Sequence, residues 1–198
     1  MSNMDVKNLS NNGLVSFIKK TYPVSDFTAN FIADNFEPVI LSKYQLTLRE
    51  GSINSDYIFL EKGYMRSYVL DIDGNEVTTN IFKPDEMVFE VESYFQRKPS
   101  KENIEAITSC VVWIGKYEKC QRLFHTLPEF REFGRAILVR GFTELKKRTI
   151  SMIKEKSEKR YEDLLSESPD IFRHVPLKFI ASYLGITNTS LSRLRKTT

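Results

Sequence analysis

Residues 180–196 read IASYLGITNTSLSRLRK, a segment that ends in polar and cationic side chains. Asn can form two hydrogen bonds with adenine, Arg can bind O6 and N7 of guanine, and the methyl group of Thr can contact that of thymine. Short hydroxyl side chains and Lys suit phosphate oxygens. The candidate DNA-binding residues are therefore Thr187, Asn188, Thr189, Ser190, Ser192, Arg193 and Lys196.

These side chains need a rigid framework, and the same segment predicts one. Ala181 stands where two crossing helices would approach most closely, and Gly185 can end the first helix in a conformation that a Cβ penalises. Thr187 is placed to cap the second helix. The pattern indicates a helix-turn-helix, and the alternative is a degenerate motif kept for packing. The apolar positions that would face the seam between the helices are Ile180, Leu184, Ile186, Leu191 and Leu194.

Charge is distributed unevenly along the chain. The net charge of the whole chain is +3, but residues 1–127 carry −3 and residues 128–198 carry +6. The basic second part favours a polyanionic partner such as DNA. A solvated basic helix is the alternative explanation for charge alone.

The middle of the chain is built of short runs rich in β-branched and aromatic residues. Turn-like pairs separate these runs at intervals of about 8–12 residues, which is typical of a β-sandwich or barrel. Asp73-Gly74, between SYVLDI and EVTTNIF, is the strongest hairpin turn. The first forty residues have helical spacing instead, with apolar positions that include Phe27, Phe31 and Phe36.

A long helix is predicted after Pro128, with two apolar stripes. One stripe steps by four and three residues as a coiled-coil seam does, and a second copy of the helix is its simplest cover. Phe133, Ile137, Ile150 and Ile153 lie partly on another face, which the β domain can cover. The alternative is a helix buried wholly against its own domain. The candidate dimer residues are Leu138, Phe142, Leu145, Thr149 and Met152.

Composition excludes several classes of protein. The amino-terminal segment is unlike a signal peptide, and no apolar run is long enough to span a membrane. We therefore expect a cytoplasmic protein without membrane contact. Two cysteines are too few for a disulfide scaffold or an iron–sulfur cluster. Cys110 is expected in the core, whereas Cys120, beside Gln121 and Arg122, is expected to be exposed, which would leave redox sensing open.

The order of these parts, together with the segments IASYLGITNTSLSRLRK, LREG, IFLEKGYMRSYVLDIDGNEVTTNIF and KPDEM, resembles the Crp/Fnr family of transcription regulators. The likeness is greatest to short-tailed, Bacteroidetes-type members. It implies an α+β fold: an amino-terminal cyclic-nucleotide-binding-like β-roll (double-stranded β-helix or jelly roll), a dimerisation helix, and a carboxyl-terminal helix-turn-helix. It also implies a homodimer that reads a palindromic double-stranded DNA operator and works with RNA polymerase. The expected domains are 1–127, 128–156 and 157–198.

The resemblance also indicates whether the β-roll could bind a cyclic nucleotide as its effector. Family members that bind cyclic nucleotides carry a Gly-Glu pair and, ten residues after the Glu, an Arg for the phosphate. These positions fall here on Phe89, Glu90 and Ser100. Burying a phosphodiester without its cation costs several kcal/mol, so tight binding of cyclic AMP is not expected. Another small effector, or none, remains open, with Glu90, Arg97 and Lys101 as its candidate residues.

Catalysis is not expected. The sequence has no G-x-S-x-G, P-loop or G-x-G-x-x-G motif, and its two His residues lie outside the β segment, so it offers no metal triad. Glu90 and Glu92 could form a carboxylate pair, but solvent-facing acids are commoner on strands. The remaining alternative is a ligand-binding β-roll whose terminal helices serve protein–protein contacts only.

Overall fold

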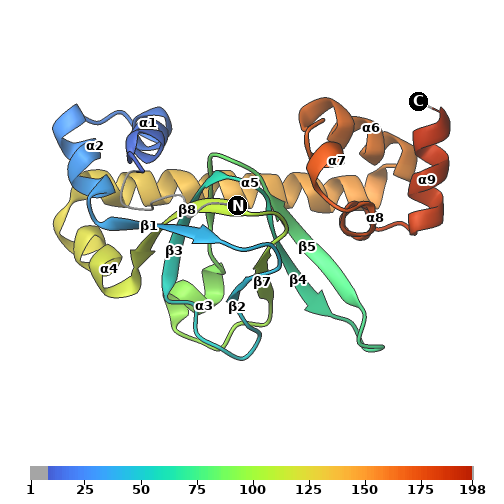
Figure 1. Ribbon diagram of the computed structural model, residues 1–198, viewed down its shortest axis with the longest axis horizontal. Helices are drawn as coiled ribbons and strands as arrows, with labels where there is room; N and C mark the ends of the chain where they lie inside the picture. Colours follow the sequence, from blue (N-terminus) through green and yellow to red (C-terminus); the bar gives the residue numbers. More distant parts are fainter. Residues whose placement is uncertain (1–8, 198) are drawn as a thin grey trace.

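A computed structural model describes residues 9–197, of which Thr197 is placed only by its backbone. Helix α5 (Pro128–Lys154) runs along the whole molecule (Figure 1). A β-roll lies beside its middle, helices α1 and α2 lie at one end, and α6–α9 lie at the other. We call α6–α9 the head. This is the expected α+β fold with an amino-terminal β-roll and carboxyl-terminal helices.

The β-roll consists of two four-stranded antiparallel sheets, ordered β1-β8-β3-β6 and β2-β7-β4-β5. Helix α3 lies between β6 and β7 in the chain, and α4 follows β8. The bounds of the first part are α1 Asn12–Thr21, α2 Asp26–Ala33, β1 Phe36–Leu41, β2 Leu46–Leu48, β3 Asp56–Lys62, β4 Met65–Leu70, β5 Glu76–Phe82, β6 Glu86–Val88, α3 Val91–Gln96, β7 Asn103–Ala106, β8 Cys110–Lys116 and α4 Tyr117–Thr126. The head consists of α6 Ser157–Glu167, α7 Ile171–His174, α8 Leu177–Leu184 and α9 Asn188–Thr197.

The predicted hairpin turn is confirmed between β4 and β5. Leu70 pairs with Glu76, and Gly74 at the turn has φ +81°, which Gly adopts without steric cost. The carboxylate of Asp71 accepts hydrogen bonds of 2.9 Å from the backbone N–H groups of Asp73 and Asn75. The turn therefore holds its shape through local sequence alone.

The helical prediction for the first forty residues is wrong at its end. Helix α2 ends at Ala33, and Phe36 begins strand β1, where Pro38 pairs with Trp113 of β8. Pro cannot donate to a ladder, but β1 is an edge strand, where a missing N–H is tolerated. Phe36, whose apolar side chain at helical spacing suggested a helix face, is buried on a strand instead.

Three apolar cores divide the molecule. One lies beneath α1 and α2, one fills the roll, and one joins the roll to the head. Cys110 is buried in the roll as expected, but the expected exposure of Cys120 is wrong. Cys120 lies on the inner face of α4, so close to β8 that a Cβ on Gly115 would stand 2.6 Å from its sulfur. Between residues 9 and 197 the structure contains no helix with the length and apolar character needed to cross a membrane.

Candidate DNA interface and effector groove

Helices α8 and α9 form the predicted helix-turn-helix geometry. Gly185 ends α8 with φ +68°, and the backbone N–H of Ile186 donates to Ala181 O at 3.0 Å. The hydroxyl of Thr187 accepts from the backbone N–H of Ser190 at 3.1 Å, which caps the start of α9. The turn is therefore closed at both ends by hydrogen bonds.

The candidate DNA-binding residues lie outside this seam. Ile180, Ala181 and Leu184 of α8 and Leu191 of α9 are buried between the helices and the roll. Steps of four residues place 188, 192 and 196 in one row along α9 and 189 and 193 in the neighbouring row. We call these two rows the ridge of α9. The exposed candidates are Thr187, Asn188, Thr189, Ser192, Arg193 and Lys196, whereas Ser190 is half-buried.

The predicted seam of α5 is open to solvent along most of its length. Phe142 is 68% exposed and Leu145 58%, Thr149 is exposed, and Leu138 is half-buried. Met152 also contacts the head, because a Cβ on Gly185 would lie 2.5 Å from the methyl group of Met152. In the second stripe Phe133 is buried in the core that includes α1 and α4, but Ile153 is 77% exposed, so only the first half of that stripe is covered.

A groove of about 1430 Å³ lies between the roll, α5 and the part of the head formed by α6 and α8. The roll contributes polar side chains at Ser67, Thr79 and Asn80 and carboxylates at Glu86, Glu90 and Glu102. Among the described residues, the Lys and Arg side chains that line the groove all come from α5 and α6. Burial raises the pKa of Glu86 and of Glu102, and hydrogen bonds from Thr79 and Ser67 partly offset this for Glu102.

The structure does not bring the three candidate effector residues together. Glu90 lines the groove, but its two carboxylate oxygens accept from the backbone N–H groups of Glu92 and Ser93 and cap α3.

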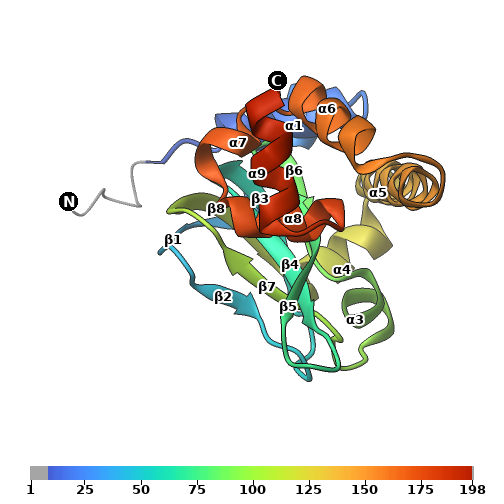
Figure 2. The same ribbon diagram turned by 90° about the vertical axis from the view of Figure 1, so that its right-hand side faces the viewer.

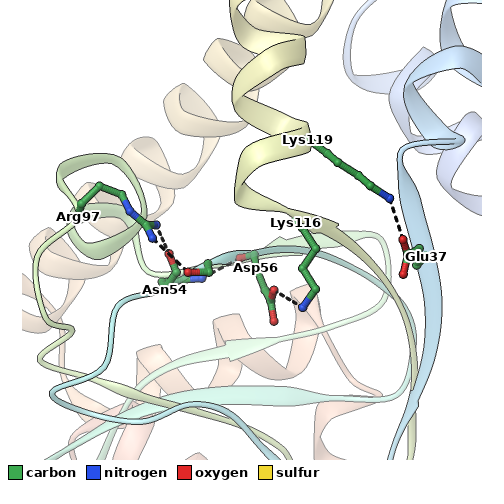
Figure 3. A network of polar contacts seen from close by, with 7 residues as sticks. Glu37, Asn54, Asp56, Arg97, Lys116 and Lys119 are labelled. Carbon is green, nitrogen blue, oxygen red and sulfur yellow. Dashed lines mark hydrogen bonds and ion pairs between the residues drawn. The ribbon is translucent and has the colours of Figure 1, made fainter.

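Arg97 is turned away from the groove: Nη1 donates to Asn54 O at 2.6 Å (Figure 3). Its guanidinium also lies 3.8 Å from the ring centre of Tyr117. Lys101 is exposed and pairs with Glu92.

The position that would carry the phosphate-binding Arg is closed. Ser100 is 3% exposed, and its hydroxyl donates to Glu102 O at 2.8 Å. Phe89 lines the groove and packs against Tyr57, with ring centres 4.6 Å apart. Within residues 9–197 no cluster of three or more His, Cys, Asp or Glu side chains is arranged to hold a metal ion.

Sequence reasoning missed the residues that join the head to the roll. Arg66 is 1% exposed and contacts α8, although its strand reads as an apolar run, YMRSYVL. A lone cation in the middle of such a run was the available signal, because an Arg is almost never fully buried unless it is paired. Figure 2 shows the head from its end of the molecule, with α8 beside β4 and β5.

Comparison with known proteins agrees with this architecture. Residues 39–126 match the model of the cyclic nucleotide-binding domain. No curated protein matches the chain in sequence. Among solved structures, FixK2 from Bradyrhizobium japonicum superposes with a TM-score of 0.72 at 16% identity, covering 82% of this chain and 83% of that one.

Two further structures are similar over most of their length. A transcriptional regulator assigned to the Crp/Fnr family from Eubacterium rectale has a TM-score of 0.69 at 16% identity, covering 90% of this chain and 87% of that one. The c-di-GMP-responsive global regulator CLP of Xanthomonas campestris has a TM-score of 0.69 at 17% identity, covering 87% and 91%. At these identities the likeness is one of fold.

Proposed function

We propose that the protein is a DNA-binding transcriptional regulator of the Crp/Fnr type, because residues 39–126 match a cyclic nucleotide-binding domain and a Crp/Fnr regulator shares the fold over 90% of this chain. The observation that carries this proposal is the exposed ridge of α9. Asn188, Thr189 and Arg193 are side-chain types that read base edges, and they stand on the outer face of the second helix of a helix-turn-helix. We propose no catalytic role.

Charge supports a nucleic-acid partner for this ridge. From Leu177 to Thr198 the sequence holds Lys178, Arg193, Arg195 and Lys196 and no acidic residue. A surface made for protein docking is enriched in aromatic and apolar side chains at its centre. The outer face of α9 instead carries amide, hydroxyl and cationic groups, which suit phosphates and base edges.

Dimerisation is the second part of the proposal. Phe142 and Leu145 project from α5 into solvent, at positions one coiled-coil step apart. A second copy of α5 would bury this stripe of one chain against the same stripe of the other. It would also set two heads side by side. Two recognition helices about 34 Å apart would then read a two-fold-symmetric operator. RNA polymerase stays a predicted partner.

We further propose that the groove does not bind cyclic AMP tightly. A phosphate entering along the roll would meet Glu86, Glu90 and Glu102, while Arg97 is engaged elsewhere and Ser100 is buried. The backbone N–H groups at the start of α3 are already occupied by the carboxylate of Glu90. Cyclic AMP at 100 times its dissociation constant would stabilise the protein by about 2.7 kcal/mol. The expected result is no shift in melting temperature at millimolar cyclic AMP, and a saturable shift would contradict it.

A salt titration tests DNA binding against the alternative of protein contacts only. Fluorescent duplexes selected from random DNA by the full chain are titrated at several salt concentrations. Because each neutralised phosphate releases counterions, log K should fall linearly with log salt, with a slope of about −0.9 per phosphate. Failure to enrich any sequence, with no binding at low salt, would leave the protein-contact alternative.

A further inference from the structure

A buried cation lies between the roll and the head. Arg66 of β4 is 1% exposed, and its Nε donates to Glu105 Oε1 on β7 at 2.7 Å. Its Nη2 forms an ion pair with the same oxygen, also at 2.7 Å. Its Nη2 also pairs with Glu76 of β5, and Nη1 donates to Thr78 Oγ1 at 3.3 Å. A buried charge persists only when it is paired and hydrogen-bonded, and the roll supplies these partners from two neighbouring strands.

The open face of this guanidinium is covered by the head. The carbon centre of the Arg66 guanidinium lies 3.5 Å from the ring centre of Phe179 on α8. A cation over an aromatic face is held most strongly where water is excluded, and both side chains are buried. Phe179 therefore rests on a cation whose position is fixed by the roll.

A second contact joins the same two elements. Strand β5 is the last strand of its sheet, so part of its backbone has no neighbouring strand to pair with. The backbone N–H of Thr78 donates to the hydroxyl of Ser182 on α8 at 2.8 Å. Ile81 of β5 adds apolar contact in the core that includes Phe179 and Ala181. The head thus covers the free edge of the sheet.

The other face of the same two strands lines the groove. Ser67 follows Arg66, Thr79 follows Thr78, and successive side chains of a strand point to opposite faces. The hydroxyls of Ser67 and Thr79 are 2.7 Å apart, and both residues line the groove. The pairing register shifts between Ser67 and Tyr68, and such an irregularity lets Asn80 line the groove beside Thr79.

We propose that Arg66 is the positioning residue of the head: it holds α8 on β4 and β5, so that the orientation of α9 follows the strand pair that floors the groove. This inference rests on the proposed function only for its consequence in DNA binding. A ligand that displaced Ser67 or Thr79 would move Arg66 and Thr78, because each lies one residue away on the same strand. The contact between groove and head therefore needs no intermediate element.

Two substitutions test the positioning role in the full-length protein. Arg66→Lys keeps the charge for Glu105 but loses the planar stack and the fork of donors. Phe179→Leu removes the stack from the head side and leaves the roll unchanged, so it remains informative if the first variant folds poorly. Arg97→Lys is the matched control, because Arg97 also stacks on a ring, Tyr117, far from the head.

Hydrogen exchange of backbone amides reads the position of the head without DNA. A desolvated cation–π contact is worth about 2 kcal/mol, so amides of α8 should exchange roughly thirtyfold faster in both variants. Amides of β8 should change less than about twofold, and Arg97→Lys should leave α8 unchanged. Unchanged exchange of α8, or equal acceleration of α8 and β8, would overturn the proposal.

Affinity for selected DNA is the second readout. Both variants should bind more weakly than the parent, with an unchanged salt slope because no phosphate contact is removed. A parent protein that binds no DNA would end the proposed function, while the exchange data would still decide whether Arg66 positions the head. Weaker exchange protection of α8 with unchanged DNA affinity would overturn the link between the two.

Discussion

The hydroxyl of Ser182 accepts a 2.8 Å hydrogen bond from the backbone N–H of Thr78, which joins the head to the edge of the β-roll. Thr78 is fully buried, so Ser182→Ala would leave a buried donor unpaired. We expect the free energy of unfolding to fall by about 1–3 kcal/mol. Urea unfolding measures this, with Ser192→Ala on the exposed face of α9 as a control that should change stability by less than about 0.5 kcal/mol. A Ser182→Ala variant as stable as the parent would contradict the role of this bond.

Two glycines should respond in opposite directions to the same substitution. Gly185 has φ +68°, and a Cβ there would stand 2.5 Å from Met152 Cε, so Gly185→Ala should destabilise the protein by about 1–2 kcal/mol. Gly141 lies in the middle of α5, and a Cβ there would meet nothing within 4 Å, so Gly141→Ala should stabilise the protein by about 0.5–1 kcal/mol. Thermal unfolding compares them, and equal effects would show that the turn at Gly185 is not constrained.

Leu145→Glu should abolish the dimer. The substitution places a charge in the centre of the stripe formed by Leu138, Phe142, Leu145, Thr149 and Met152. Sedimentation equilibrium should find a monomer. A binding titration with the selected duplex should find that the monomer has lost its DNA affinity. Thr143→Glu introduces the same side chain at a position that points away from the stripe, and it should remain dimeric. A dimeric Leu145→Glu protein would refute the stripe as the interface.

The thiols should be inert in the native protein. Burial raises the pKa of Cys120 to about 12, with a smaller effect of Asp56 in the same direction, and burial also raises the pKa of Cys110. A raised thiol pKa leaves almost no thiolate at pH 8, and the thiolate is the reactive form. An aromatic disulfide reagent should therefore label neither cysteine at pH 8 until urea is added. Rapid labelling of the folded protein, assigned by Cys120→Ala, would reopen redox sensing.

Elements that depend on local sequence could be predicted. The turn at Asp73-Gly74, the long helix after Pro128 and the helix-turn-helix all follow from short-range rules of φ, spacing and capping, and the structure contains each of them. The resemblance to the Crp/Fnr family is confirmed at the level of the fold. The likeness to Bacteroidetes-type members stays a prediction.

Features that depend on long-range packing could not be predicted. Cys120 has polar neighbours in the chain, yet it faces β8 because α4 turns that side inward. Arg148 follows two lysines in the sequence, yet its guanidinium stacks on the ring of Tyr183 and donates to Tyr183 O at 2.9 Å. The burial of Arg66 needs partners 39 and 113 residues away, Glu105 and Phe179, which no local pattern brings together.

The most direct test of the central claim is the sequence specificity of Arg193→Ala against Lys196→Ala on DNA selected by the parent protein. If α9 reads base edges, Arg193→Ala should cost about 1–3 kcal/mol on the selected operator and tolerate changes at one base pair of each half-site. Lys196→Ala, removing a phosphate contact, should weaken binding to all sequences alike and lower the salt slope by about one. Equal loss on every sequence for Arg193→Ala, or no selected sequence at all, would contradict the account.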